Sequence, residues 1–300
     1  MSLNQRIKEW LKDTTQILDI SDLRLTKWPE QLVGKEYLIK ELDCSDNKLT
    51  SLPNGLTKLK TLDCWNNELI SIPNSLTKLK ILDCNINKLT SLPNNLIKLE
   101  ILYCHYNKLT SLPDNLTKLE KLYCSRNKLT SLPNNFTKLK ILNCSHNQLT
   151  SLPSWLNLEI LDCYDNKLTS IPNNLTKLET LYCWNNKLTS LPNNLTNLKR
   201  LFCSDNELTS LPNGLTKLNE LVCFNNKLFS NELEKWKKIW PISLRHQHIL
   251  RNAGLKKVVK ILKNRSYLPR LDELHHELIW SPNHPGKFFE LLPRCGNWCK

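Results

Sequence analysis

Leucine and isoleucine recur along most of this chain at a fixed spacing, with polar residues between them. One unit, LKTLDCWNNELISIP at residues 59–73, shows the phrase that repeats. The period is marked by cysteines twenty residues apart, with one step of nineteen: Cys44, Cys64, Cys84, Cys104, Cys124, Cys144, Cys163, Cys183, Cys203 and Cys223. A fixed period of this size predicts a solenoid, in which each unit is one coil packed against its neighbours.

The segment that ends at each cysteine predicts a short β-strand. Leu62 and Cys64 are two residues apart, so both side chains point to one side of the strand while Asp63 points to the other. Stacked coils then form a parallel sheet with the leucines and cysteines buried. Twenty residues are too few for a strand and a full helix, so we expect a return path of extended chain or one 3-10 turn, which Pro73 also favours.

An asparagine follows each of these cysteines by three residues, from Asn47 to Asn226. Backbone groups lose their partners where the chain leaves the strand, and a buried amide can both donate to them and accept from them. A degenerate first unit has Leu18 and Ile20 in the strand but Leu23 at the asparagine position. We therefore interpret it as a transition to an N-terminal cap.

Helices are predicted before and after the repeats. Leu3, Ile7, Trp10 and Leu11 have the spacing of an amphipathic helix that could cover the open end of the first coil. After residue 231 the period stops, and short apolar stretches at helical spacing follow. We predict three regions: a helical cap at 1–16, about eleven repeats at 17–231, and a basic helical segment at 232–300.

Residues 17–231 resemble short leucine-rich repeats of the LPxxLxxLxxLxxxxNxL kind found in bacterial effector proteins. The cysteine-bearing variant LDCxxNKLTSLPNN is most similar to repeat proteins of giant DNA viruses of amoebae. The ending from Arg270 resembles C-terminal segments that recur in such viral proteins. The resemblance implies a solenoid with a curved parallel sheet on its concave side, an irregular convex side, and a non-catalytic protein-binding role without a cofactor.

The outward strand positions vary most between the repeats, and in solenoids such positions line the binding surface. Neighbouring strands lie about 4.8 Å apart, so we expect Tyr182, Trp184, Phe202 and Phe224 to form one patch. Aromatic residues dominate interface hot spots, although aromatic pairs that only stabilise the sheet are the alternative. The residues predicted to bind a protein on the concave face are Asp43, Asp63, Trp65, Asp83, Tyr103, His105, Tyr106, Tyr123, Arg126, Tyr164, Tyr182, Trp184, Phe202 and Phe224.

Basic residues are concentrated in the C-terminal segment. The chain has a net charge of +14, and residues 232–300 carry 14 Lys and Arg against 6 Asp and Glu. Lysines also recur along the repeats, but they do not interleave with aromatics in one groove as binding of single-stranded nucleic acid requires. Nucleic-acid binding by the repeats is therefore disfavoured, and binding through the basic tail remains an alternative.

Twelve cysteines raise the questions of metal, redox and disulfide chemistry. The ten repeat cysteines form one inward row rather than a tetrahedron, so we interpret them as small buried hydrophobes. No secretion signal or membrane span is recognisable, which favours a reducing cytoplasmic location (host cytoplasm or virion if the protein is viral). Cys295 and Cys299 remain as alternatives for a zinc site or for ubiquitin transfer. We predict no catalytic, metal or cofactor residues.

Overall fold

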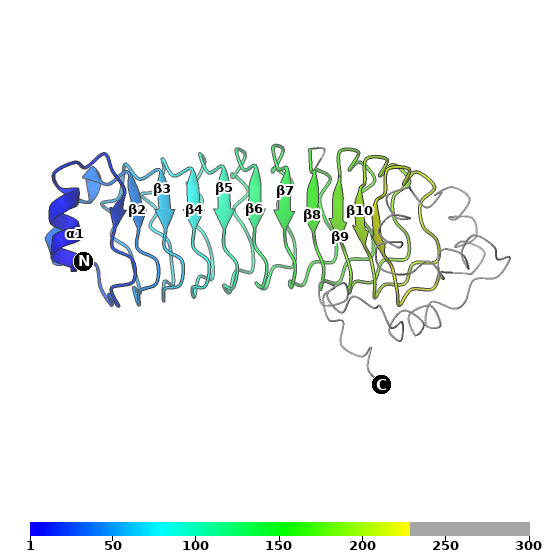
Figure 1. The fold of residues 1–300 in the computed structure, drawn as a ribbon, viewed down its shortest axis with the longest axis horizontal. Helices are drawn as coiled ribbons and strands as arrows, with labels where there is room; N and C mark the ends of the chain where they lie inside the picture. Colours follow the sequence, from blue (N-terminus) through cyan, green and yellow to red (C-terminus); the bar gives the residue numbers. More distant parts are fainter. Residues whose placement is uncertain (156, 229–300) are drawn as a thin grey trace, which may run out of the picture. The chain divides into compact units, whose positions relative to one another are not determined.

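The structure is a computed structural model that describes residues 1–155 and 157–228. Helix α1 (Leu3–Trp10) opens the described chain, and a parallel sheet of eleven strands follows. The strands lie in the sheet in chain order, so each pairs with its neighbours in the sequence (Figure 1). The predicted helical segment at 232–300 lies outside the described residues.

Strand β1 has two residues and each later strand has three. The strands are β1 (Leu18–Asp19), β2 (Glu41–Asp43), β3 (Thr61–Asp63), β4 (Ile81–Asp83), β5 (Ile101–Tyr103), β6 (Lys121–Tyr123), β7 (Ile141–Asn143), β8 (Ile160–Asp162), β9 (Thr180–Tyr182), β10 (Arg200–Phe202) and β11 (Glu220–Val222). Two 3-10 helices, η1 (Glu30–Leu32) and η2 (Glu36–Leu38), lie between β1 and β2. The later return paths that the structure describes are turns and extended chain, which confirms the prediction.

The inward leucines set the register of the sheet. Leu62 is aligned with Leu42 on one side and with Leu82 on the other. All three side chains are fully buried. The backbone N–H of Cys64 donates to the carbonyl oxygen of Asp83 at 2.8 Å, so the pairing continues past the end of the strand. The predicted alternation of inward and outward positions is therefore confirmed.

Each asparagine of the column joins its own coil to the preceding one. Asn67 Nδ2 donates to the carbonyl oxygen of Cys44 at 2.9 Å and to that of Cys64 at 3.2 Å. Its Oδ1 accepts a hydrogen bond from the backbone N–H of Leu49 at 2.9 Å. The buried amide thus supplies partners to backbone groups that the turn would leave unpaired, as the sequence predicts.

An asparagine of the second coil forms equivalent hydrogen bonds to the backbone of the first coil. Asn47 Oδ1 accepts from the backbone N–H groups of Leu23 and Leu25 at 3.2 and 2.9 Å. Leu23 occupies the asparagine position of a coil that has no coil before it. No preceding backbone therefore needs an amide at this position, which explains why a leucine is accepted here.

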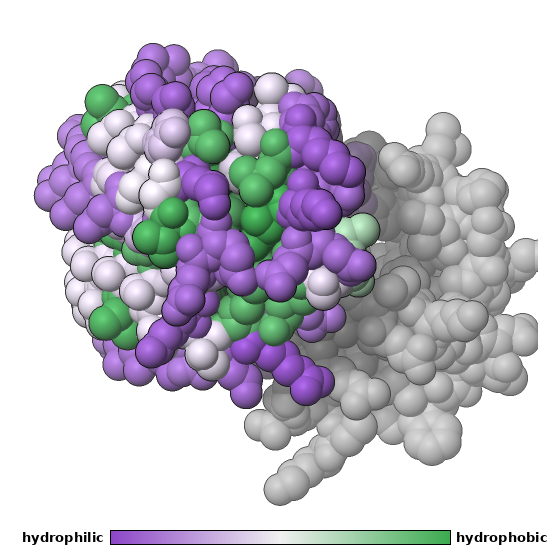
Figure 2. Space-filling model, turned by 90° about the vertical axis from the view of Figure 1, so that its left-hand side faces the viewer, coloured by the Kyte–Doolittle hydropathy of each residue, from purple (hydrophilic) through white to green (hydrophobic). Residues whose placement is uncertain are grey.

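Helix α1 packs against β1 and η1. A capping box starts it: the backbone N–H of Gln5 donates to Ser2 Oγ at 3.4 Å, and that of Ser2 donates to Gln5 Oε1 at 3.0 Å. Ile7 and Trp10 are buried, but Leu11 is 41% exposed because the helix ends at Trp10. The prediction that Leu11 belongs to the covering face was wrong. Figure 2 looks onto this end, where apolar residues remain visible among hydrophilic ones. None of the helices within residues 1–155 and 157–228 has the length and apolar character needed to span a bilayer.

The nineteen-residue unit is accommodated by two large aromatic side chains. Trp155 is 2% exposed and takes the buried place between Leu152 and Leu158 that Phe136 fills in the preceding unit and a leucine fills in most others. Its ring stacks on that of Phe136, with centroids 6.2 Å apart and planes 14° apart. The larger ring volume compensates for the missing residue, so the stacking of the coils is maintained.

Candidate functional site on the outward face of the sheet

The outward face of the sheet, called the sheet face below, carries three columns of side chains. In β3 and the turn that follows, the columns hold Thr61, Asp63 and Trp65, all half-exposed. The residues predicted to bind a partner lie half-exposed on this face, except Tyr106 and Arg126. These two are exposed and lie on its edge, one position beyond the third column.

The N-terminal part of the sheet face is a row of aspartates in register. Asp63 pairs with Asp43 on one side and with Asp83 on the other. The Asp83 carboxylate accepts the backbone N–H of Asn85 at 3.0 Å. Burial, helped by the nearby Asp63 charge and opposed by this hydrogen bond, raises the pKa of Asp83 to about 6. The acidic end therefore carries less negative charge in mildly acidic solution than its residue count suggests.

A first aromatic group follows on β5 and β6. The rings of Tyr103 and Tyr123 stack with centroids 4.7 Å apart and planes 12° apart. His105 meets Tyr123 edge-on at 5.9 Å, and its Nδ1 accepts the backbone N–H of Ser125 at 3.1 Å and also contacts the Ser125 hydroxyl. Burial lowers the pKa of His105. The ring is therefore neutral at pH 7, with its proton on Nε2.

A second aromatic group lies further along the sheet. Tyr164 stacks on Trp184, with centroids 3.9 Å apart and planes 9° apart. Tyr182 meets Trp184 edge-on at 5.9 Å and stacks on Phe202 at 4.8 Å. The expected contact of Tyr182, Trp184 and Phe202 is confirmed, and Tyr164 joins them. Phe224 follows the adjacent strand β11. We call Tyr164, Tyr182, Trp184 and Phe202 the C-terminal aromatic group.

Asn143 and Asp162 separate the two aromatic groups. They lie in register between Tyr123 and Tyr182, and Asn143 Nδ2 donates to Asp162 Oδ2 at 3.1 Å. Burial raises the pKa of Asp162 to about 7. The sheet face thus has two aromatic surfaces rather than one continuous one, and the break between them is largely uncharged below pH 7.

Apolar residues that are not among the predicted site residues extend the sheet face. They occupy the first position of their strands: Ile81, Ile101, Ile141 and Ile160. Ile160 is 37% exposed, and the other three are half-exposed. The alternation that points Leu102 inward turns both Ile101 and Tyr103 outward, so the signal was present in the sequence.

Lysines beside the strands form ion pairs with glutamates of neighbouring coils. Lys80 lies 2.8 Å from Glu100, and Lys140 lies 2.9 Å from Glu120. Such exposed pairs contribute about 0–1 kcal/mol each, because water screens them. They do reduce the positive charge open to a polyanion along this side. Nucleic-acid binding through residues 232–300, which are not among the described residues, stays a prediction.

The repeat cysteines are free thiols, and all but the partly exposed Cys223 are buried. Burial raises the pKa of Cys64 well above its usual value, and the Cys64 thiol donates to the carbonyl oxygen of Asp83 at 3.2 Å. In the part of the chain that the structure describes, no three metal-binding side chains converge. Cys295 and Cys299, with the predictions that concern zinc and ubiquitin transfer, fall outside that part.

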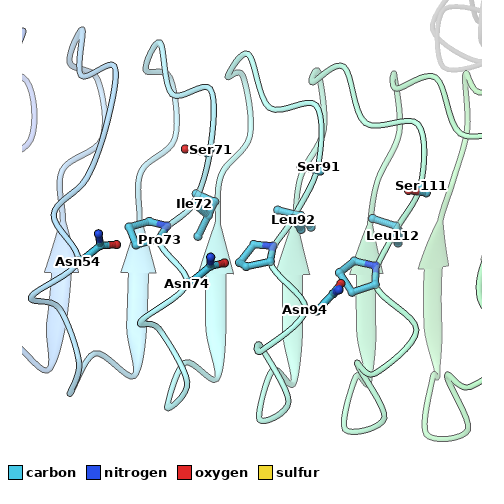
Figure 3. Close-up of a pocket in the computed structure, with 12 residues that line it drawn as sticks. Asn54, Ser71, Ile72, Pro73, Asn74, Ser91, Leu92, Asn94, Ser111 and Leu112 are labelled. Carbon is cyan, nitrogen blue, oxygen red and sulfur yellow. The ribbon is translucent and has the colours of Figure 1, made fainter.

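Two open hollows lie on the side of the solenoid opposite the sheet. Their volumes are about 570 and 490 Å³, and both are lined by the repeated Ser-Leu-Pro-Asn segment or its isoleucine variant. Figure 3 shows Asn54, Asn74 and Asn94 in one row with the proline rings of neighbouring coils. The same repeated residue types line every part of both hollows, so the hollows result from the spacing of the coils. No polar groups converge in them as they would in a ligand site.

Comparison with known proteins agrees with this architecture. Residues 97–135, 117–157 and 156–195 match the model of the family described as leucine-rich repeats in two copies, and residues 38–59 and 58–79 match the single leucine-rich repeat. No curated protein matches the chain. Together with the eleven-stranded parallel sheet, the matches show that this chain contains leucine-rich repeats, as its sequence predicts.

Solved structures with the same fold come from several kinds of organism. A leucine-rich repeat protein of Leptospira interrogans is 26% identical, with a TM-score of 0.56 over 73% of this chain and 74% of its own. The functional domain of InlJ from Listeria monocytogenes, which includes a cysteine ladder, is 26% identical, with a TM-score of 0.51 over 70% of this chain and 61% of its own. The plant peptide hormone receptor RGFR1 in complex with RGF2 is 25% identical, with a TM-score of 0.53 over 67% and 42%. The resemblance to giant-virus proteins stays a prediction.

Proposed function

We propose that the sheet face binds a protein and that the C-terminal aromatic group is the centre of the contact. The observation that carries the proposal is the continuous row of half-exposed rings of Tyr164, Tyr182, Trp184 and Phe202. Aromatic surface that is exposed in clusters marks interaction sites, and aromatic side chains contribute most to interface hot spots. Their stacking also fixes the rings before a partner arrives, which reduces the entropy lost on binding.

The similar structures support a scaffold role without naming a partner. RGFR1, a plant peptide hormone receptor, was solved in complex with RGF2, and the present chain spans 42% of that receptor chain. Leucine-rich repeat solenoids act typically as interaction scaffolds and leave catalysis to other domains. We therefore propose a non-catalytic role for the repeats. The competing explanation is that the rings only stabilise neighbouring strands.

A double variant, Tyr182→Ala with Trp184→Ala, separates the two explanations. The tagged full chain is used to recover partners from a cell extract, and the dissociation constant of each purified partner is measured by calorimetry. Loss of two hot-spot residues weakens binding at least about 100-fold. Tyr37→Ala is the control, because Tyr37 is 50% exposed but lies in η2, away from the sheet face. Unchanged affinity in the double variant, with a lowered Tm, would show that the rings serve the sheet alone.

A further inference from the structure

The second residue after the cysteine position has a left-handed backbone conformation in every coil and lies on the edge of the sheet face; in the first coil Arg24 shares this conformation. Its φ is close to +50°, a region that asparagine and aspartate tolerate better than other side chains do. We call this column the rim, and most of its members are indeed of these two types: Asp22, Asp46, Asn66, Asp165, Asn185, Asp205 and Asn225. The middle of the rim departs from the rule with Ile86, Tyr106, Arg126 and His146.

Polar rim residues stabilise the stack of coils by bonding to each other. Asn66 Nδ2 donates to Asp46 Oδ1 at 2.7 Å, and Asn225 Nδ2 donates to Asp205 Oδ1 at 2.7 Å. His146 also takes part, because its Nδ1 contacts the Asp165 carboxylate. In three coils the rim residue is of another type, and no such hydrogen bond is formed among the described residues: Ile86, Tyr106 and Arg126.

Ile86 is the least expected of these residues. Its φ is +50°, and a β-branched side chain is strongly disfavoured in that conformation. It is 41% exposed, so burial of its side chain does not compensate for the strain. The surrounding coils hold Ile86 in this conformation, and residues strained in this way cluster at functional sites.

The next two rim residues extend an exposed surface from Ile86. Tyr106 is 51% exposed, and the Arg126 guanidinium lies over its ring, 4.9 Å from the centroid. The stacked rings of Tyr103 and Tyr123 lie on the sheet face in the same two coils as Tyr106 and Arg126. An isoleucine, a tyrosine and an arginine thus follow one another along the rim, beside an aromatic surface.

The exposed charges at the rim of the Tyr106 and Arg126 coils are positive, whereas the Asp83 carboxylate is aligned with Tyr103 on the sheet face. Lys108 and Lys128 follow Tyr106 and Arg126 by two residues, are exposed, and form no ion pair with the described residues. Glu100 and Glu120 lie on the other side of the strands, where they pair with Lys80 and Lys140. The rim of these two coils therefore has three cations, Arg126, Lys108 and Lys128, that form no ion pair with the described residues.

We propose that Ile86, Tyr106 and Arg126 bind an extended acidic segment of a partner protein, with an apolar side chain of that segment placed on Ile86 and Tyr106. The inference rests on the proposed function of the sheet face and defines the chemistry of its partner. Carboxylates of the segment pair with Arg126, Lys108 and Lys128, and Arg126 is already held by its contact with Tyr106. The segment crosses the rim towards Tyr103 and Tyr123.

Panning of random 12-residue peptides displayed on phage against the full-length chain tests the proposal. We expect the recovered peptides to be rich in Asp and Glu and to contain an apolar residue. Synthesised peptides should bind the triple variant Ile86→Asn, Tyr106→Asn and Arg126→Asn at least about 30-fold more weakly, and their affinity should fall as salt is added. Basic or uncharged peptides, or no recovered peptide, would overturn the proposal.

Two further measurements separate this inference from the proposed function and from misfolding. The variant Tyr182→Ala with Trp184→Ala should bind the acidic peptides within about threefold of the unmodified chain, because its changes lie on the other aromatic surface. Peptides that are lost from this variant but kept by the rim variant would contradict the rim and support the proposed function. A fluorescent oligo-dT that binds through the rim, with no acidic peptide recovered, would assign it to nucleic acid instead.

The single variant Ile86→Asn adds a test that instability cannot imitate. Asparagine tolerates φ near +50°, so we expect its Tm to rise by about 2–4 °C while peptide affinity falls about tenfold. A fall in Tm, or a rise in Tm with unchanged affinity, would contradict the view that the strain serves binding.

Discussion

Asn107 reaches back to Cys84 in the preceding coil, where its Nδ2 donates to the backbone carbonyl oxygen at 2.9 Å. Its Oδ1 accepts from the backbone N–H of Leu89 at 3.0 Å. Replacing Asn107 by alanine leaves the buried backbone N–H of Leu89 without its partner, whereas the carbonyl oxygen of Cys84 still accepts from Asn87 Nδ2 at 3.2 Å. We therefore expect about 1–3 kcal/mol of lost stability. Urea unfolding followed by circular dichroism measures this loss.

The matched control for this prediction is Asn94→Ala. Asn94 belongs to the exposed side of a return segment, so its removal should change the free energy of unfolding by less than about 0.5 kcal/mol. Similar losses in the two variants would mean that the asparagine column does not hold the coils together.

Trp155 offers a test of packing against hydrogen bonding. Its Nε1 is buried and has no hydrogen-bond partner within the described residues. Trp155→Phe loses no hydrogen bond and keeps a ring against Phe136, so we expect a change below about 1.5 kcal/mol. Trp155→Ala empties the site and should cost about 3–5 kcal/mol. Thermal unfolding measures the loss of stability in each variant. Equal losses would contradict the view that the volume of the Trp155 ring compensates for the missing residue of the nineteen-residue unit.

The raised pKa of Asp162 predicts a pH-dependent stability. Its value of about 7 in the folded chain exceeds the ordinary value near 4, so the folded state binds the proton more tightly. The contribution of Asp162 is therefore fully favourable below pH 4 and is lost as the pH rises through 7. We expect Asp162→Asn to stabilise the chain by about 1–2 kcal/mol at pH 8, a value reduced for partial solvent contact, and to have no effect at pH 4.

Denaturation of the Asp162→Asn variant across this pH range gives the measurement. Asp114→Asn removes an exposed carboxylate from the opposite side of the solenoid and should leave the pH profile unchanged. A benefit of Asp162→Asn that is as large at pH 4 as at pH 8 would show that the proton on Asp162 is not its cause.

Thiol labelling should distinguish Cys223 from the other repeat cysteines. Cys223 is partly exposed, and burial raises its pKa only to about 11, whereas the pKa of Cys144 lies well above its usual value. Because the thiolate is the reactive form, N-ethylmaleimide should modify Cys223 first in the native chain. Mass spectrometry of tryptic peptides gives the rate at each residue. Equal rates at Cys223 and Cys144 would contradict the buried thiol row.

The sheet could be predicted because two periods agree. The spacing of two between Leu62 and Cys64 assigns the buried side, and the spacing of twenty aligns Leu62 with Leu82. The sequence predicts that the Asn67 amide bonds to backbone groups of the turn, but it does not predict that some of these groups belong to the preceding coil. The contact of Asn67 with Cys44 depends on the offset between coils, which no local pattern encodes.

The candidate site could be predicted only in part. Tyr182 and Phe202 occupy equivalent positions of units of equal length, so their stacking follows from the repeat. The edge-on contact of His105 with Tyr123 depends on side-chain rotamers, which the sequence does not determine. Ile86 was not among the predicted site residues, although most rim positions carry asparagine or aspartate, a bias that indicates a left-handed backbone.

Each asparagine bonds to the backbone of the preceding coil. One repeat can therefore be gained or lost as a complete unit. A coil brings the amide that its predecessor needs, as Asn107 does for the coil of Cys84. Duplication or loss of one twenty-residue unit therefore leaves every remaining backbone group with its partner. Such an event would move the surface of Tyr103 and Tyr123 relative to that of Tyr182 and Trp184 by one strand spacing, about 4.8 Å. The distance between binding surfaces can thus evolve in fixed steps without compensating mutations.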